Sequence, residues 1–317
     1  MRSASDEYSF RQITREDLPE LVALFELSFE RTVTLDWLEA KFATEWTGVS
    51  YLAFVAVSSD NRIAAFYALY PVMMNLSGRE VIAAQSGDTM THPAHRKRGL
   101  FLQLAERTYQ EAAKQGIVLV FGFPNENSVG GFRNHLNWRF LPDLVTTEFR
   151  CGGSWLTHCY QKLRHRSEER VFEHLETVKA NDQTSAMSSE ANSVVRDAGY
   201  LQYKHRIANG VVIEAEGLVV WLKPGRRIDV GAMNGEQDMT SEELAVRLRR
   251  IMKMCGAHTM RFTYSADSEP LRKILNIAQV QSRTVAGYLY LGGSEGEVAS
   301  SDQVADLFFC RGDLDYF

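Results

Sequence analysis

The chain has 317 residues, of which 45% are hydrophobic and 24% charged, with a formal net charge of −5. This balance is typical of a soluble globular protein, and at about 100–200 residues per domain the length predicts two domains. The mild acidity gives no reason to expect nucleic acid or an anionic membrane as a partner. No stretch approaches the ~20 apolar residues that span a bilayer, and the opening residues MRSASDEYSF do not resemble a signal peptide.

The four cysteines are Cys151, Cys159, Cys255 and Cys310. They show no C-x-x-C spacing and no nearby histidine set suited to zinc, so we expect no metal site. Free thiols in a cytoplasmic protein are the favoured interpretation. An extracellular protein with two disulfides is the less favoured alternative.

The first half alternates strand and helix patterns. Thr14 and Asp17 form a candidate helix cap, and the apolar residues that follow recur at helical spacing. Gly116 ends the strongest helix. The predicted strands are 8–13, 50–58, 62–76, 80–91, 117–123 and 138–150, and the predicted helices are 18–29, 34–46, 99–115 and 128–136. This order predicts an α/β (α+β) fold, a mixed central sheet with helices on both faces.

The second half repeats this order more weakly. The polar segment 181–192 favours a linker or insertion. Strands are then predicted near 200–207, 210–223, 226–233, 258–265 and 281–292, and helices at 241–255 and 268–277. We therefore expect a domain at 1–150, a linker at 151–199 and a second domain at 200–317.

The segment with the strongest chemical signal is 85–101, QSGDTMTHPAHRKRGLF. Small residues and Gly87 precede Pro93, which ends the strand, and a glycine within a strand often marks close approach by a backbone or ligand. Four basic residues, 95–98, then stand directly before a helix, where each exposed cation opposes the helix dipole at a cost of roughly 0.3–1 kcal/mol. An anion at the helix start would explain them, and Gly99 would let backbone N–H groups approach it. A solvated basic turn before an ordinary helix is the alternative.

This segment resembles motif A of the GNAT acyltransferase superfamily, whose loop reads Q/R-x-x-G-x-G/A. Here the loop is Arg96-Lys97-Arg98-Gly99-Leu100-Phe101, which departs from the pattern at Phe101. It is similar to a bacterial branch with R-G-x-G-I-F loops and a following G-F-P-N-x-N-S string, found here at 122–128, although Lys97 replaces a glycine. Residues 132–138 resemble motif B, with Arg133 and Asn137 as departures. The resemblance covers 8–150 and is faint over 200–292, which resembles the inactive second half of tandem members.

The resemblance implies a GNAT fold with a second GNAT-like domain, and a site for acetyl-CoA or another acyl-CoA. In that family the pantetheine arm lies between two splayed strands, here 80–91 and 117–123, and pairs with exposed backbone. Phe132 is either a wall of the thiol pocket or a residue of the helix core. The implied cofactor-binding residues are Met90, Thr91, Arg96, Lys97, Arg98, Gly99, Leu100, Phe101, Asn127 and Phe132.

The catalytic residues depart from the family pattern. Arg133 stands where the family usually has a tyrosine that acts as the acid for the leaving thiolate. Gln85, which cannot act as a base, stands where the family commonly has a glutamate. Asp88 is the nearest carboxylate on the strand and is our favoured base; an ion pair with Arg96 or Lys97 is its alternative role. The C-terminal segment with Asp313, Asp315 and the Phe317 carboxylate is the second candidate, because tandem relatives can place this carboxylate in the active site. An ordinary solvated terminus is the alternative for that segment.

In the second half, Thr240 and Glu243 form a capping box, and Asp238 and Glu242 repel anions. We expect no cofactor site there.

The resemblance implies a cytoplasmic N-acetyltransferase that transfers an acyl group to a primary amine, by direct attack in a ternary complex. The expected partner is a small polar amine such as an amino sugar, without nucleic acid or membrane; a homodimer is left open. One alternative is a CoA-binding module without activity. Another is an aminoacyl-transfer enzyme that uses charged transfer RNA, which the acidic balance disfavours.

Overall fold

The computed structural model describes residues 7–151, 192–292 and 306–314. The chain divides into two compact units. Unit 1 comprises Met1–Leu141 and Val285–Asp306, and unit 2 comprises Pro142–Thr284 and Leu307–Phe317.

Unit 1 is built on a mixed sheet with the strand order β1-β2-β3-β4-β5-β14-β6. Neighbouring strands in this order are antiparallel except β4 and β5, which are parallel. The strands are β1 (Tyr8–Gln12), β2 (Ala53–Ser58), β3 (Ile63–Leu76), β4 (Arg79–Thr91), β5 (Leu119–Gly122), β6 (Arg139–Phe140) and β14 (Gly287–Tyr290).

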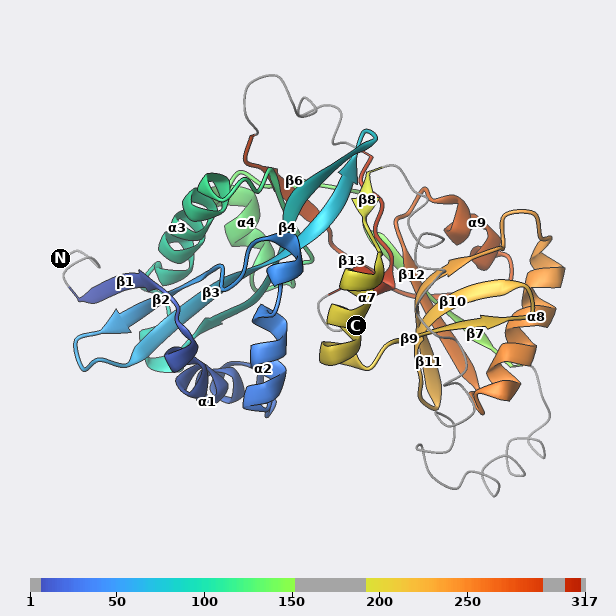
Figure 1. Ribbon diagram of the computed structural model, residues 1–317, viewed down its shortest axis with the longest axis horizontal. Helices are drawn as coiled ribbons and strands as arrows, with labels where there is room; N and C mark the ends of the chain where they lie inside the picture. Colours follow the sequence, from blue (N-terminus) through green and yellow to red (C-terminus); the bar gives the residue numbers. More distant parts are fainter. Residues whose placement is uncertain (1–6, 152–191, 293–305, 315–317) are drawn as a thin grey trace. The chain divides into compact units, whose positions relative to one another are not determined.

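Helices cover both faces of this sheet (Figure 1). Helices α1 (Leu18–Phe29) and α2 (Leu35–Phe42) pack on one face, and α3 (Leu100–Lys114) and α4 (Val129–His135) on the other. Helix α3 buries a stripe at helical spacing that includes Leu104, Thr108 and Ala112. The expectation of a mixed sheet with helices on both faces is confirmed.

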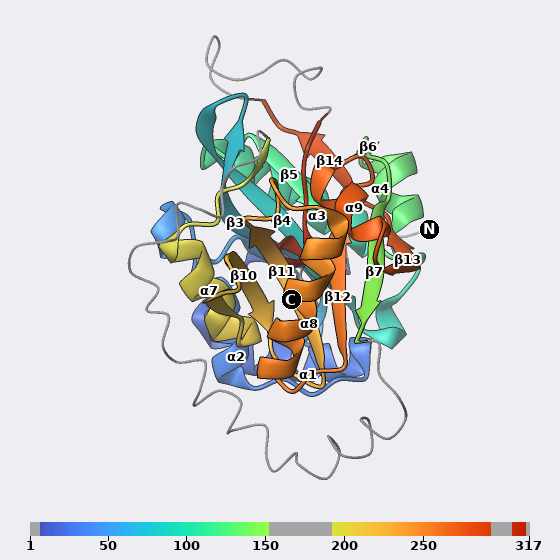
Figure 2. The same cartoon turned by 90° about the vertical axis from the view of Figure 1, so that its right-hand side faces the viewer.

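Unit 2 has its own sheet, in the order β13-β7-β12-β11-β10-β9. Helix α8 (Ser241–Met254) lies across one face (Figure 2) and buries Leu244, Leu248, Ile251 and Met252. The other elements are β7 (Leu144–Arg150), β8 (Ser193–Val194), α7 (Ala198–Ala208), β9 (Val211–Ala215), β10 (Leu218–Lys223), β11 (Arg227–Asn234), β12 (Thr259–Tyr264), α9 (Glu269–Leu275) and β13 (Gln279–Thr284).

The two sheets share one plan. Each has an antiparallel series that ends in a parallel pair, β4 with β5 and β11 with β12. The strand after that pair comes from the other half of the sequence: β14 follows β5 in unit 1, and β7 follows β12 in unit 2. The last positions, β6 and β13, are again filled from the unit's own half. The similar order of elements in the two halves of the sequence thus corresponds to two sheets with the same strand order.

The compact units differ from the predicted domain boundaries in two places. The stretch 138–150, predicted as one strand, is two: β6 belongs to unit 1 and β7 to unit 2. Likewise 281–292 divides into the end of β13 in unit 2 and β14 in unit 1. Most of the predicted linker, residues 152–191, lies outside the described residues.

The prediction of a strand near 200–207 is wrong, because this stretch lies in the helix α7. The Asp197 side chain caps it by accepting the Tyr200 N–H at 2.8 Å. Tyr200, Tyr203 and Lys204 are buried at helical spacing. Burial of one helical face decides the conformation here.

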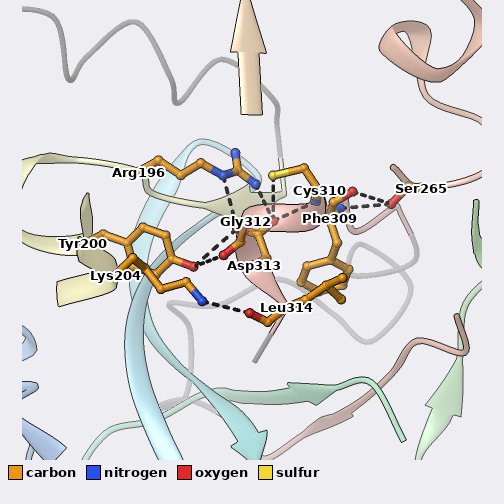
Figure 3. A network of polar contacts seen from close by, with 9 residues as sticks. All are labelled: Arg196, Tyr200, Lys204, Ser265, Phe309, Cys310, Gly312, Asp313 and Leu314. Carbon is orange, nitrogen blue, oxygen red and sulfur yellow. Dashed lines mark hydrogen bonds and ion pairs between the residues drawn. The ribbon is translucent and has the colours of Figure 1, made fainter. Parts of the chain in front are cut away.

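The C-terminal segment is packed into unit 2 as far as Leu314 (Figure 3). Asp313 is fully buried and forms an ion pair with Arg196 at 2.5 Å. Lys204 donates to the Leu314 carbonyl at 2.9 Å. A Cβ at Gly312 would lie 1.9 Å from the Trp221 ring, so only glycine fits there. The alternative of a solvated terminus is therefore wrong for residues 307–314.

Candidate active site

Strands β4 and β5 part in the middle of β4. Their parallel register runs from Ala83 opposite Leu119 to Ser86 opposite Gly122, where β5 ends. Strand β4 continues to Thr91, and Met90 and Thr91 still pair with β3 on their other side. Backbone on the β5 side of 87–91 thus lies beyond the last pair of this register. An extended ligand arm can add to such a backbone edge as a further strand.

A bulge shapes this end of β4. Gly87 pairs with Ala68 and Met90 with Phe66, so Asp88 and Thr89 together oppose a single residue of β3. Asp88 has a φ of +49°, in the left-handed region that non-glycine residues rarely adopt. A bulge bends a strand and redirects its side chains, and bulges are common beside active sites.

The loop after β4 turns through two left-handed residues, Lys97 (φ +64°) and Gly99 (φ +71°). Lys97 stands where similar loops have glycine, and this φ gives the reason for that glycine. Helix α3 begins at Leu100, and the N–H of Gln103 makes its first turn bond, to Gly99 O at 3.3 Å. The N–H groups of residues 100–102 therefore have no helical acceptor. A Cβ at Gly99 would meet no atom within 4 Å, so there is open space beside the residue that precedes these groups.

The cationic side chains of this loop are not all directed to a ligand. Arg98 makes an ion pair with Glu7 at 2.6 Å, and Arg96 donates to the Thr91 carbonyl at 3.4 Å. Lys97 is exposed. The backbone of the loop, rather than a cluster of guanidinium groups, is the better anion site.

Phe101 and Phe132 pack on each other under the helix start. Their ring centroids are 5.2 Å apart, and Phe132 lies 4.4 Å from the Trp138 ring. Phe132 is 4% exposed and belongs to the core between the sheet and α3. These contacts agree with the alternative in which Phe132 is a residue of the helix core. Its role as a wall of the thiol pocket stays a prediction.

Asn127 lies in a turn that is organised by Asn125. The Asn125 side chain accepts the N–H groups of Asn127 and Ser128 at 3.0 and 3.2 Å. The Asn127 side chain is exposed, in the loop between β5 and α4. Its predicted contact with the cofactor arm stays a prediction.

Asp88 is held by two residues that the sequence did not single out. Its Oδ2 accepts from the Tyr70 hydroxyl at 2.5 Å and from the Lys41 ammonium, which comes from α2. The side chains of Lys41 and Asp88 are 1% and 6% exposed. The Lys41 ammonium also lies 4.4 Å from the Tyr70 ring centroid.

Asp88 therefore forms an ion pair, as in the predicted alternative, but its partner is Lys41 and not Arg96 or Lys97. Uptake of a proton by Asp88 would break a buried ion pair, which is costly. The geometry therefore makes Asp88 a weaker candidate for the base than the sequence suggested.

Gln85, three residues before Asp88 on β4, is also buried. It is paired with Tyr70 across the β3–β4 register and is 5% exposed. Its Nε2 has no hydrogen-bond partner among the residues that the structure describes. A buried donor of this kind is unusual in a folded protein.

The second candidate for the base, Phe317, lies outside the described residues, as does Asp315. Asp313 is committed to a structural role: besides Arg196 it accepts the Cys310 N–H at 2.8 Å. Beside Asp313, burial raises the pKa of the Cys310 thiol to about 12.

Helix α8 of unit 2, at the position that α3 has in unit 1, begins with a capping box. Thr240 accepts the Glu243 N–H at 3.2 Å, and Glu243 accepts the Thr240 N–H at 2.9 Å. This capping box confirms the predicted one and takes up the Glu243 N–H, one of the first-turn groups that an anion would need.

Within the described ranges no group of histidine, cysteine and acidic residues could hold a metal ion. None of the helices described is long and apolar enough to cross a membrane.

Comparison with known proteins gives a family match for part of the chain. Residues 9–140 match the family model described as an acetyltransferase (GNAT) domain. No curated protein shows a significant match to the chain.

Among solved structures the chain is similar to a GCN5-related N-acetyltransferase from Kribbella flavida, with a TM-score of 0.57 and 15% identity over 90% of this chain and 72% of that one. It is also similar to a putative acetyltransferase from Pyrococcus horikoshii (TM-score 0.56, 12% identity, 98% and 95% covered). A third similar structure is a GCN5-related glucosamine N-acetyltransferase region of a fungal multi-domain β-N-acetylglucosaminidase. Its TM-score is 0.54 and its identity 12%, over 89% of this chain and 38% of that one. At these identities the likeness shows the fold. Together with the family match, it identifies residues 9–140 as a GNAT acetyltransferase domain.

Proposed function

We propose that the protein uses acetyl-CoA, or another short acyl-CoA, to acylate the primary amine of a small polar acceptor. The observation that carries this proposal is the coincidence of two features on consecutive elements. The backbone edge of β4 beyond Ser86 is followed directly by the left-handed loop and the open start of α3. The first suits an extended arm and the second a pyrophosphate.

The residues present fit such a cofactor. The N–H groups of residues 100–102 would hold the pyrophosphate, and the Lys97 side chain in the same loop would add a positive charge. The backbone of Met90 and Thr91 would pair with the pantetheine arm. When bound, the group supplies an acyl carbon activated as a thioester. The chain's own residues position the amine, exclude water and hold the proton that the amine must lose.

The acceptor and its base are the least constrained part of the proposal. An amino sugar is our proposal for the acceptor; one structure with this fold carries a glucosamine N-acetyltransferase in its name. Asp88 and the Phe317 carboxylate stay the two candidate bases, and an amine that arrives uncharged would need neither. A cytoplasmic location is also proposed, since Cys151, Cys255 and Cys310 are free thiols.

The test is binding of acetyl-CoA to parent, Gly99→Val and Gly116→Val proteins. Gly116 matches Gly99 closely: it lies just after the other end of α3, has a φ of +80° and also has open space at Cβ. Both substitutions strain the backbone, but only a β-branched side chain at 99 shields the helix start. At 100 times its dissociation constant, acetyl-CoA should stabilise the parent and Gly116→Val by about 2.7 kcal/mol, and Gly99→Val by none.

Equal melting shifts in all three proteins would show that the pyrophosphate is not bound at this loop. Release of free thiol with a mixed amine panel separates an active transferase from a CoA-binding module without activity. A module would show the shift without thiol release.

A further inference from the structure

A chain of four side chains joined by hydrogen bonds runs through the core of unit 1 to the point where β4 and β5 part. The Trp138 indole Nε1 donates to the Tyr109 hydroxyl at 3.1 Å. The Tyr109 and Tyr67 hydroxyl oxygens are 2.8 Å apart, and Tyr67 and Ser86 are 2.7 Å apart. Trp138, Tyr109 and Tyr67 are buried, whereas Ser86 is half-buried.

The direction of these hydrogen bonds follows from counting donors. An indole N–H can only donate, so the Tyr109 oxygen accepts from Trp138. If Ser86 donated to Tyr67 and Tyr67 to Tyr109, the Tyr109 hydrogen would have no acceptor among the described residues. A buried donor without an acceptor costs about 1–3 kcal/mol.

The opposite direction satisfies every phenol in the chain. Tyr109 donates to Tyr67, and Tyr67 donates to Ser86. Burial raises the pKa of both tyrosines well above the usual value of 10, so each keeps the hydrogen it donates. The Ser86 oxygen then accepts, and the Ser86 hydrogen is the single donor left over at the end of the chain.

Ser86 presents this hydrogen at a particular place. Its partner in the last β4–β5 pair is Gly122, which has no side chain, and the two strands separate beyond it. Ser86 therefore sits where the reactive end of an arm lying between β4 and β5 would arrive. Its hydrogen bond to Tyr67 places its side chain on the same side of the sheet as α3, which carries Tyr109.

We propose that the Ser86 hydroxyl donates a hydrogen bond to the sulfur of the bound acyl-CoA and stabilises that sulfur as it becomes a thiolate. This inference rests on the proposed function. In the transfer, the amine nitrogen bonds the acyl carbon, the C–S bond breaks with its electron pair on sulfur, and the proton of the amine passes to the base or, for an amine that arrives uncharged, to solvent. Ser86 keeps its own proton. Tyr67 and Tyr109 act as positioning residues that fix the direction of the Ser86 donor.

The experiment titrates the thiol of CoA bound to the protein, followed by the ultraviolet absorption of the thiolate. A donor at Ser86 stabilises the thiolate, so the bound thiol should ionise about one pH unit lower in the parent than in Ser86→Ala. Thr108→Val is the control: it deletes a buried hydroxyl of α3 that only bonds the Leu104 carbonyl, and should titrate like the parent. In turnover, Ser86→Ala should lower kcat about tenfold with the KM for acetyl-CoA unchanged, the effect of one hydrogen bond to a charged group.

Identical thiol titrations in the parent and Ser86→Ala would overturn the inference. So would a loss of acetyl-CoA affinity without a change in the thiol titration, because the hydroxyl would then contact another part of the arm. Melting temperatures check that both variants are folded. Failure of the parent to bind acetyl-CoA is a separate result, and it would remove the proposed function itself.

Discussion

A large side chain in the proposed cofactor loop, Phe101, lies against a glycine of the neighbouring helix α4, Gly131. Phe101 stands where the family loop has a small residue, and its ring packs against α4. A Cβ at Gly131 would lie 2.5 Å from Cε1 of that ring, closer than real carbon atoms approach. Gly131 thus gives the space that Phe101 occupies. The departure from the family pattern is compensated locally, at the start of the helix that the proposal assigns to the pyrophosphate.

Gly131→Ala should therefore push the Phe101 ring and disturb the start of α3. We expect a loss of about 1–3 kcal/mol in the free energy of unfolding, typical of overpacking, together with weaker acetyl-CoA binding. Gly130→Ala is the matched control in the same helix, because a Cβ there meets no atom within 4 Å; removing a glycine from a helix should stabilise it slightly. Phe101→Leu should relieve Gly131→Ala in the double variant. Denaturant unfolding that ranks the two alanine variants equally would contradict this account.

The sequence predicts this loop because its signals are local. Pro93, Gly99 and the cations of 96–98 are neighbours, and their order alone indicates a strand end followed by an open helix start. The partner of Asp88 could not be predicted in this way, because Lys41 is 47 residues away and contacts it only through the fold. The Tyr67–Ser86 bond is similarly non-local. Contacts of this kind depend on which elements pack together, which residue spacing does not encode.

At the scale of elements, the buried ion pair between Lys41 and Asp88 joins α2 to the bulge of β4. Both side chains are almost fully buried, so each charge depends on the other. The bulge also carries the left-handed Asp88, whose backbone conformation costs energy unless its surroundings hold it. We infer that α2 holds the bulge in shape, and that the bulge in turn positions the edge at Met90 and Thr91.

Substitution of only one residue of this ion pair leaves a buried charge without its partner, so the two single variants should together cost more stability than the double variant. Lys41→Met and Asp88→Asn alone should each lower the free energy of unfolding by about 3–5 kcal/mol, and the double variant Lys41→Met/Asp88→Asn by clearly less than their sum. The exposed pair Arg15–Glu39 provides the control cycle, with an expected coupling of at most about 1 kcal/mol. Additive effects at Lys41 and Asp88 would contradict the role of this pair.

The same variants test the base. Loss of a general base lowers the rate by roughly 10²–10⁴-fold and flattens the acidic limb of the pH profile. If Asp88 mainly holds the bulge, the double variant should recover most of the rate that Asp88→Asn loses. A rate that stays low in the double variant, with a flattened acidic limb, would restore Asp88 as the base.

Element types were predictable over most of the chain, but the assignment of strands to sheets was not. Amphipathic spacing and caps predicted α3 and α8 to within a residue or so at each end. The segments that became β7 and β14 gave a strand signal, yet each pairs in the sheet of the other half. A strand's periodicity records which face is buried and says nothing about its partner. The predicted boundary at 150 failed for this reason.

At the scale of the whole molecule, two sheets of the same order carry very different helix starts. In unit 1, α3 follows the left-handed Gly99, and its first turn keeps free N–H groups. In unit 2, α8 follows Thr240, whose side chain together with Glu243 closes the capping box. Glu242 and Glu243 also place negative charge in that first turn, which disfavours a bound anion. We therefore expect the anion site in unit 1 alone.

We accordingly expect one CoA per chain. Titration calorimetry of the parent should return a stoichiometry of one, and Gly99→Val should return no binding, since the remaining helix start in unit 2 cannot substitute. A variant that opens the second start, Thr240→Gly with Glu242→Gln and Glu243→Gln, should lose about 0.5–2 kcal/mol of stability through the lost cap but should gain no site, because unit 2 lacks a left-handed basic loop at that position. Two sites in the parent, or one site surviving in Gly99→Val, would show that unit 2 binds the cofactor and that the contrast between the two helix starts does not decide where CoA goes.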